Sequence, residues 1–249
     1  DETVIDLSAS KAQELFSYLL LYRERLHSRD VLADLLWGDT TSGRQAKAYL
    51  RKTLWQIERA LEGEAGNADI PLLTVEQETV RVDRQAGLWL DTAILEDAFA
   101  QVRGIEGHEL SDDQAAPLEQ AVALYRGDLL EGWYQDWCVY ERARLQHIYL
   151  LLLDKLTSYC EAHARYEQGL LYGSTALQYD RARESTHRRM MRLYSKLHDR
   201  TSALRQYETC VSALREELSV EPSQRTVELY ERLRSDESVP IVQDSSCAY

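Results

Sequence analysis

Apolar side chains recur every three or four positions between Thr40 and Leu61, which is the spacing of a helix with one buried face. This apolar stripe consists of Ala46, Leu50, Leu54, Ile57 and Leu61. The positions between them carry mainly basic side chains, namely Arg44, Lys47, Arg51, Lys52 and Arg59. The pattern therefore predicts an amphipathic helix that rests on a core through one face and presents a cationic face to solvent.

Two shorter helices are predicted before it. The first follows from a stripe made of Leu15, Phe16, Leu19, Leu20 and Tyr22. Ser28 is placed to cap the second helix, whose apolar positions are Val31, Leu32, Leu35 and Leu36. We expect Gly38 to end this helix, because glycine adopts the left-handed conformation at a helix end without steric cost.

A β-hairpin is predicted after the long helix. Beyond a loop from Gly63 to Pro71, alternating apolar residues flank the turn from Glu76 to Thr79, and they are Leu73, Val75, Val80 and Val82. Three helices followed by a hairpin are the element order of a winged helix-turn-helix, in which the third helix enters the DNA major groove.

The second half of the chain predicts helices throughout. Ser111 and Gln114 have the spacing of a capping box for a helix that ends near Tyr125. A corner containing Trp133 and Trp137 precedes a long helix from about Val139 to Cys160. Gly169, Leu170 and Ala176 are followed 34 residues later by Ala203, Leu204 and Cys210, and 34 residues is the tetratricopeptide period. Pro222 is placed where such a repeat would end one helix and begin the next.

Composition narrows the function classes. The 249 residues carry a net charge of −13, which argues against unspecific binding to nucleic acid or to an anionic membrane. Local DNA binding is still compatible with this charge, because exposed charges are screened over roughly 8 Å at physiological salt and most of the excess acid lies after Arg84. No apolar run reaches the length of a membrane-spanning helix, and the four cysteines lack paired short spacing. We therefore expect a cytoplasmic protein with reduced thiols.

Several motifs resemble one family in their order and spacing. They are Leu20–Arg29 (LLYRERLHSR), Leu32–Asp39 (LADLLWGD), Leu50–Leu61 (LRKTLWQIERAL), Trp89–Asp91, Tyr125–Leu130 (YRGDLL), Asp136–Trp137, Ala203–Tyr207 (ALRQY), Glu217–Pro222 (ELSVEP) and Leu229–Tyr230. This set resembles the antibiotic regulatory (SARP-type) transcriptional activators over nearly the whole chain.

The resemblance implies a mainly α protein with two domains. These are an N-terminal winged helix-turn-helix DNA-binding domain over 1–84 and a C-terminal TPR-like bacterial transcriptional activation domain over 88–234. The polar composition of 235–249 predicts a loose tail. The resemblance further implies binding of double-stranded promoter DNA and contact with RNA polymerase or with a second copy. The sequence departs from the family in two places. Only Val4–Leu7 represent the strands that usually precede the first helix, and the hairpin tip is acidic at Glu76 and Glu78.

The predicted DNA-binding residues lie on the cationic helix and just before it. Arg51 suits a bidentate contact to guanine, and its alternative role is a salt bridge to Asp30 or Asp34. Arg44 and Lys47 lie where recognition helices reach bases, Lys52 and Arg59 suit phosphate contacts, and Thr41 and Ser42 can offer hydroxyls or amides to a phosphate. Trp55 is placed at the border of the two faces, where it could touch a thymine methyl group or pack in the core. We favour core packing for this residue.

Enzymatic motifs are absent from the sequence. The six histidines lack HExxH or other metal-ligand spacing, and there is no phosphate-binding glycine loop and no nucleophile elbow. We therefore expect no catalysis, no cofactor and no metal. The remaining alternative is a helical-repeat scaffold for protein partners whose winged helix does not bind DNA, an interpretation favoured by the acidic hairpin tip and the acidic total charge.

Overall fold

The computed structural model describes residues 7, 9–64, 71–83 and 86–235, and the side chains of 62–64 are outside this description. The chain forms two compact units, Asp1–Leu90 and Asp91–Tyr249. The predicted linker from Asp83 to Trp89 is only partly described. Val4–Asp6, most of the Gly63–Pro71 loop and the tail after Ser235 lie outside the described residues.

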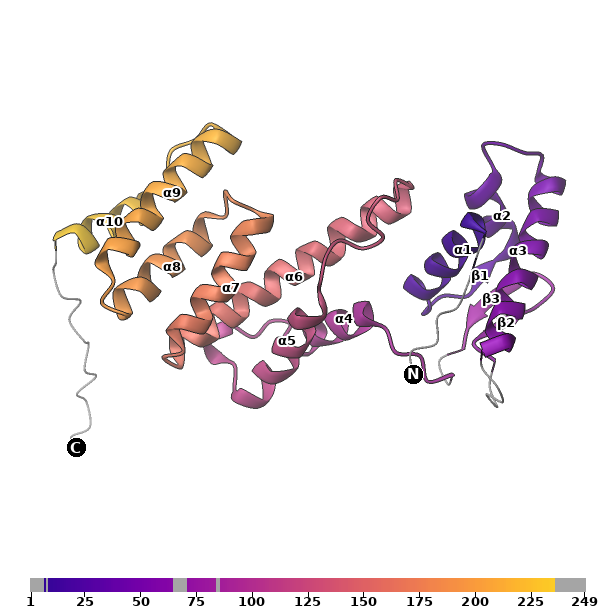
Figure 1. The fold of residues 1–249 in the computed structure, drawn as a ribbon, viewed down its shortest axis with the longest axis horizontal. Helices are drawn as coiled ribbons and strands as arrows, with labels where there is room; N and C mark the ends of the chain where they lie inside the picture. Colours follow the sequence, from indigo (N-terminus) through magenta and orange to yellow (C-terminus); the bar gives the residue numbers. More distant parts are fainter. Residues whose placement is uncertain (1–6, 8, 65–70, 84–85, 236–249) are drawn as a thin grey trace. The chain divides into compact units, whose positions relative to one another are not determined.

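The N-terminal unit contains three helices and a small sheet (Figure 1). Its elements are α1 (Ser10–Leu21), β1 (His27–Ser28), α2 (Arg29–Trp37), α3 (Gly43–Glu64), β2 (Leu73–Val75) and β3 (Thr79–Val82). The predicted hairpin is confirmed, with Leu73 opposite Val82 and Val75 opposite Val80. The sequence analysis missed β1, which pairs antiparallel with β3 so that His27 lies opposite Val80.

One core joins the helices to the sheet. Its fully buried side chains include Leu15, Leu19, Leu32, Leu50, Leu54, Ile57 and Val80. The predicted stripe of α3 is confirmed, since its first four members are buried and Leu61 packs against them at the edge. The four apolar residues of α2 divide between the core and the surface. Leu32 and Leu36 are buried, whereas Val31 and Leu35 are 62% and 42% exposed.

The end of α2 also differs from the prediction. Gly38 follows the helix with φ −53° and ψ −38°, which is right-handed helical backbone rather than the expected left-handed conformation. A Cβ atom at this position would lie 2.6 Å from the carbonyl oxygen of Asp34. Glycine is therefore required here by close approach to the preceding turn.

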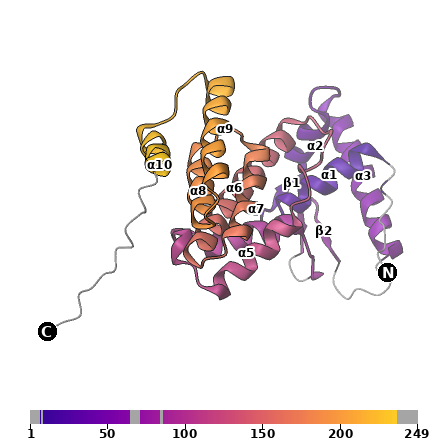
Figure 2. The same cartoon turned by 60° about the vertical axis from the view of Figure 1, so that its left-hand side comes forward.

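The C-terminal unit is an array of helices (Figures 1 and 2). Its elements are α4 (Asp91–Gln101), the 3₁₀ turn η2 (Gly107–Glu109), α5 (Asp112–Leu124), α6 (Asp136–Ala162), α7 (Tyr166–Tyr179), α8 (Glu184–Lys196), α9 (Arg200–Leu218) and α10 (Gln224–Ser235). Each helix from α6 to α10 packs against the next one in the chain. The expected mainly α class, a winged helix followed by helical repeats, is thereby confirmed.

Particular sequence signals account for several of these elements. The capping box of α5 is present, and the Ser111 N–H donates to Gln114 Oε1 at 3.1 Å. The long helix α6 begins three residues before the predicted Val139. At the tryptophan-rich corner before it, Arg142 donates to the carbonyl oxygens of Leu129, Leu130 and Trp133. These three bonds satisfy backbone acceptors that would otherwise remain unpaired.

The 34-residue repeat places small residues at buried helix contacts. Gly169 and Ala203 are buried at equivalent positions, as are Ala176 and Cys210. A Cβ atom on Gly169 would lie 3.0 Å from both Cys160 and Leu193, while one on neighbouring Gly173 would lie 2.8 Å from Met190. The backbone of α7 therefore approaches α6 and α8 more closely than larger residues would allow.

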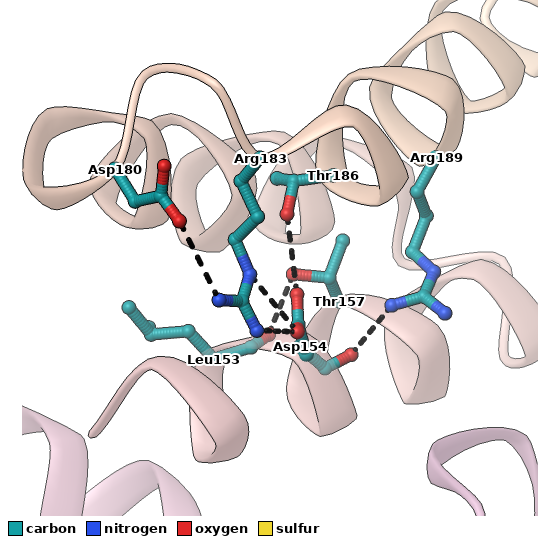
Figure 3. Close-up of polar contacts among 7 residues, drawn as sticks. All are labelled: Leu153, Asp154, Thr157, Asp180, Arg183, Thr186 and Arg189. Atoms are coloured by element: carbon teal, nitrogen blue, oxygen red, sulfur yellow. Dashed lines mark hydrogen bonds and ion pairs between the residues drawn. The ribbon is translucent and has the colours of Figure 1, made fainter. Parts of the chain in front are cut away.

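A cluster of ionic and hydroxyl groups connects α6 to α8 (Figure 3). Arg183 donates to the Asp154 carboxylate, and Thr186 Oγ1 donates to the same carboxylate at 3.2 Å. Arg189 donates to the backbone carbonyl of Asp154 at 2.9 Å. Both Arg183 and Asp154 are largely buried, with side chains 19% and 22% exposed, and a second carboxylate, that of Asp180, lies 3.8 Å from Arg183. The contacts fix the angle between the two helices by directed bonds as well as by apolar packing.

His187 is buried beside this cluster, only 1% exposed. Its Nε2 lies 2.9 Å from the Arg181 carbonyl oxygen, and its Nδ1 lies 2.6 Å from Gln206 Nε2. Because a carbonyl oxygen can only accept, Nε2 carries a proton and donates to Arg181. Burial lowers the pKa of His187, although the Arg181 carbonyl and nearby carboxylates act in the opposite direction.

This lowered pKa predicts an acid-sensitive fold. Because the unfolded chain binds a proton at pH values where folded His187 does not, the stabilisation is present above the ordinary pKa of about 6.5 and is lost as pH falls below it. The His187 share of this slope is at most about 1.4 kcal/mol per pH unit. Urea unfolding followed by circular dichroism between pH 7.5 and 5.5 should give a shallower pH dependence for His187→Gln than for the wild type.

The matched control is His108→Gln, which replaces an exposed histidine in η2 and leaves the contacts of His187 intact. Equal slopes for the wild type and His187→Gln would contradict the assignment.

Candidate nucleic-acid interface

The basic side chains of α3 lie on the face opposite its buried stripe. Arg44, Lys47, Arg51, Lys52 and Arg59 are all exposed. Their exposure follows from helical periodicity, since they fall between the positions of Ala46, Leu50, Leu54 and Ile57, which are at most 2% exposed. The core therefore determines which way the cationic face points.

Lys47 has an ionic partner within the same unit. Its Nζ atom lies 2.8 Å from the carboxylate of Asp30, the second residue of α2. Both side chains are more than half exposed, at 55% and 69%. An exposed pair of this kind contributes only about 0.2–1 kcal/mol, so a stronger anion can displace Asp30 from Lys47.

Arg51 does not form the salt bridge considered from the sequence. Asp30 pairs with Lys47 instead, and Arg51 makes no ion pair or hydrogen bond with another residue in the described ranges. The same holds, within those ranges, for Arg44 and Lys52. Three cations of α3 thus have donors available for an external ligand.

Trp55 contradicts the prediction of core packing. It is 58% exposed and lies one helical turn after Arg51, in the middle of the outward face rather than at its border. The guanidinium carbon of Arg59 lies 5.9 Å from the centre of the indole ring, within the range of a cation–π contact. The core does not take the indole, because the adjacent Leu54 occupies the buried position.

The residues before α3 form a tight turn. The hydroxyls of Thr40 and Thr41 both donate to the Trp37 carbonyl oxygen at 3.3 Å. Ser42 is exposed, and its carbonyl accepts the N–H groups of Gln45 and Ala46 at 2.9 Å. The Thr41 hydroxyl therefore stabilises the turn, whereas Ser42 lies at the exposed N-terminus of α3.

A groove of about 450 Å³ runs between α3, the start of α2 and the hairpin turn. It is lined by Ser28, Arg29, Asp30, Lys47, Leu50, Arg51, Gln77 and Glu78. Arg29 anchors the turn, since its N–H donates to the Glu78 carbonyl and its side chain donates to the Glu76 carbonyl, both at 2.9 Å. Two exposed carboxylates, those of Glu76 and Glu78, are thereby held at the turn that borders the groove.

Arg29 and Asp30 are site residues that sequence reasoning did not place in the interface. Arg29 directly follows the strand β1, which would have placed it beside the hairpin turn. A strand of two residues is too short to give an alternating pattern in the sequence. Asp30 was named as a partner for the wrong cation. The distances between α2 and α3 that decide this pairing depend on the tertiary packing of both helices.

Comparison with known proteins identifies the second unit. Residues 90–234 match the family model described as the bacterial transcriptional activator domain. The chain belongs to the bacterial transcriptional activator domain (BTAD) family. This finding confirms the SARP-type resemblance, and BTAD proteins are transcriptional regulators rather than enzymes. A search of the curated proteins gave no match.

A solved structure shares the fold of this BTAD protein. It is Mycobacterium tuberculosis EmbR in complex with low affinity phosphopeptide, with a TM-score of 0.60 and 18% sequence identity. The alignment covers 94% of the present chain and 62% of that one, so the chain spans less than two thirds of its structural relative. At this identity the likeness establishes the fold.

Two further findings concern the described residues of this BTAD protein. None of their helices combines the length and apolar character needed to cross a membrane. Among the same residues, no three His, Cys, Asp or Glu side chains are grouped closely enough to hold a metal ion.

The opposite environments of Leu54 and Trp55 predict opposite mutational effects. Leu54→Ala should destabilise the N-terminal unit by about 2–5 kcal/mol, because it opens a cavity in a packed core. Trp55→Ala should change stability by less than about 1 kcal/mol, because most of the indole is already in water. Urea unfolding of the two variants measures this difference, and a larger loss for Trp55→Ala would show that the indole is part of the core.

Proposed function

We propose that this protein is a sequence-specific DNA-binding transcriptional activator that inserts α3 into the major groove of promoter DNA. The observation that carries the proposal is a row of exposed cations, Arg44, Arg51 and Lys52, on a helix whose opposite face is fixed in the core of a winged helix. The major groove is about 12 Å wide and a helix with its side chains is about 10–12 Å across. The fit brings side chains of the outward face to the base edges.

Residue roles follow from side-chain chemistry. Arg51, in the middle of the face, donates to the O6 and N7 atoms of a guanine, a geometry that the planar guanidinium matches. Arg44 and Lys47, one to two turns earlier, reach neighbouring bases or phosphates. Lys52 and Arg59 lie toward the flank and contact phosphates, while the exposed N-terminus of α3 at Ser42 suits another phosphate.

The net charge of −13 restricts this binding to a local contact. Repulsion from acidic residues farther than a Debye length of about 8 Å is screened, but Glu78 at the hairpin turn lines the same groove as Lys47 and Arg51. The turn therefore contributes little phosphate binding, and α3 supplies most of the affinity. Binding of this kind is selective, because it lacks a broad cationic surface.

The rest of the proposed activity assigns a role to the helical unit. Two copies bind promoter repeats about one helical turn, roughly 34 Å, apart, and the C-terminal unit contacts the second copy or RNA polymerase. The support is family membership together with a repeat architecture, which offers an extended surface for protein contacts. Promoter DNA as the ligand places the protein in the cytoplasm.

Two observations favour a second candidate function. The acidic hairpin turn and the Asp30–Lys47 pair both oppose phosphate, as expected for a winged helix that docks a protein partner instead of DNA. Gel-shift assays on fragments of the source genome at low and high salt separate the two functions. A salt-sensitive, sequence-selective shift supports the activator, whereas no shift at either salt concentration supports the protein scaffold.

Substitution of Arg51 tests the base contact. Arg51→Ala should weaken specific binding by roughly 1–3 kcal/mol and relax the preference at one base pair, whereas Lys52→Ala should weaken all sequences alike and reduce the salt slope by about one unit. Fluorescence anisotropy titrations over a range of salt concentrations measure both effects. Arg225→Ala, at an exposed position of α10, is the control and should leave binding unchanged. Unaltered binding by both α3 variants would refute the role of this helix.

Neutralising Asp30 should strengthen DNA binding. Asp30→Asn releases Lys47 from its ion pair, and because such a pair is worth about 0.2–1 kcal/mol, affinity should rise by about 1.4- to 5-fold. The salt slope should steepen by up to about one unit as Lys47 neutralises a phosphate. The matched control is Asp39→Asn, which makes the same charge change at an exposed site in the α2–α3 turn. An equal gain from both variants would indicate a general charge effect without any role for Lys47.

A further inference from the structure

The most unusual side chain on the outward face of α3 is a large apolar one among the cations. Trp55 is 58% exposed, although tryptophan normally buries much of its 150–250 Å² of surface. Its neighbours at helical spacing are charged, with Arg51 one turn before it and Arg59 one turn after. An indole in the centre of a cationic face is not explained by solvation or by phosphate binding.

The indole is positioned for a contact beyond the protein. Arg44, Arg51 and Trp55 follow each other at intervals of seven and four residues, so they lie along one line of the helix. The Arg59 guanidinium lies 5.9 Å from the ring centre and restricts the ring on its C-terminal side. A ligand that meets Arg51 from the solvent side therefore meets Trp55 as well.

The edge of the DNA major groove offers one apolar group of suitable size. Each base pair presents hydrogen-bond donors and acceptors there, and thymine alone adds a C5-methyl group. Arg51 can donate to guanine but gains nothing from a methyl group, whereas the indole face gains from the methyl group through burial. The two side chains therefore select different bases.

We propose that Trp55 is a specificity-determining residue that packs against the C5-methyl group of a thymine in the operator. This inference rests on the proposed function, because it requires α3 to lie in the major groove. Four residues advance a helix by about 6 Å, and base pairs are stacked about 3.4 Å apart. The thymine therefore lies about two base pairs from the guanine that Arg51 contacts.

The test uses DNA that differs by a methyl group alone. Duplexes bound by the 249-residue chain are first selected from a random-sequence pool. Each thymine of the selected site is then replaced in turn by deoxyuridine, which keeps the base pairing and all groove donors and acceptors but lacks the methyl group. Dissociation constants are measured for the wild type, Trp55→Ala and Trp55→Phe, with circular dichroism to confirm that each variant is folded.

At one thymine position, uracil should weaken wild-type binding by about fourfold, the effect of losing one buried methyl group. Trp55→Ala should bind the thymine and uracil duplexes equally well, while Trp55→Phe should keep part of the discrimination.

Two results would overturn the inference while leaving the proposed function intact. One is selective wild-type binding that no uracil substitution weakens, as expected if the indole packs on a sugar. The other is undiminished methyl sensitivity in Trp55→Ala. Failure to select any duplex would instead overturn the proposed function, and this inference with it.

Discussion

Burial of one apolar stripe determines the orientation of the candidate interface. Ala46, Leu50, Leu54 and Ile57 are enclosed by α1, α2 and the sheet, and their burial fixes the rotation of α3 about its axis. With that rotation fixed, the polar face has only one direction in which to point. Each Leu side chain contributes about 1.5–3 kcal/mol when fully buried, more than any exposed ion pair on the same helix. Packing, rather than charge, therefore positions the cations.

Nearby acidic groups then modify the binding properties of the cationic face that packing has positioned. Asp30, paired with Lys47, and Glu78 at the hairpin turn place negative charge beside a cationic helix. These groups lower the affinity for any polyanion, but they lower it most for ligands that engage only the phosphate backbone. An interface built in this way favours ligands that also contact the side chains in the middle of α3. Such an arrangement lowers the affinity and raises the selectivity of binding. This agrees with the net negative charge of the chain.

Much of this organisation was predictable from the sequence, because periodicity directly reports which face of an element is buried. The stripe of α3, the hairpin and the capping box at Ser111 depend on residues close together in the chain. The prediction of core packing for Trp55 is wrong because it rests on hydrophobicity alone. The helical spacing places the adjacent Leu54 in the core and turns Trp55 to the exposed face. Asp30, Arg29 and the two-residue β1 depend on tertiary distances, which neither composition nor spacing encodes. Residue type alone also does not show that Val31 and Leu35, unlike Leu32 and Leu36, are exposed.

Gly169 and Gly173 affect the C-terminal unit in a way that goes beyond stability. They let the α7 backbone lie close to its neighbours, since an added Cβ would come within 3.0 Å of Leu193 at Gly169 and within 2.8 Å of Met190 at Gly173. In a stacked array, a small change in the tilt between neighbouring helices is carried to every later helix. The curvature of the surface presented to any partner is thus set partly by two residues that have no side chain and that a partner would never touch.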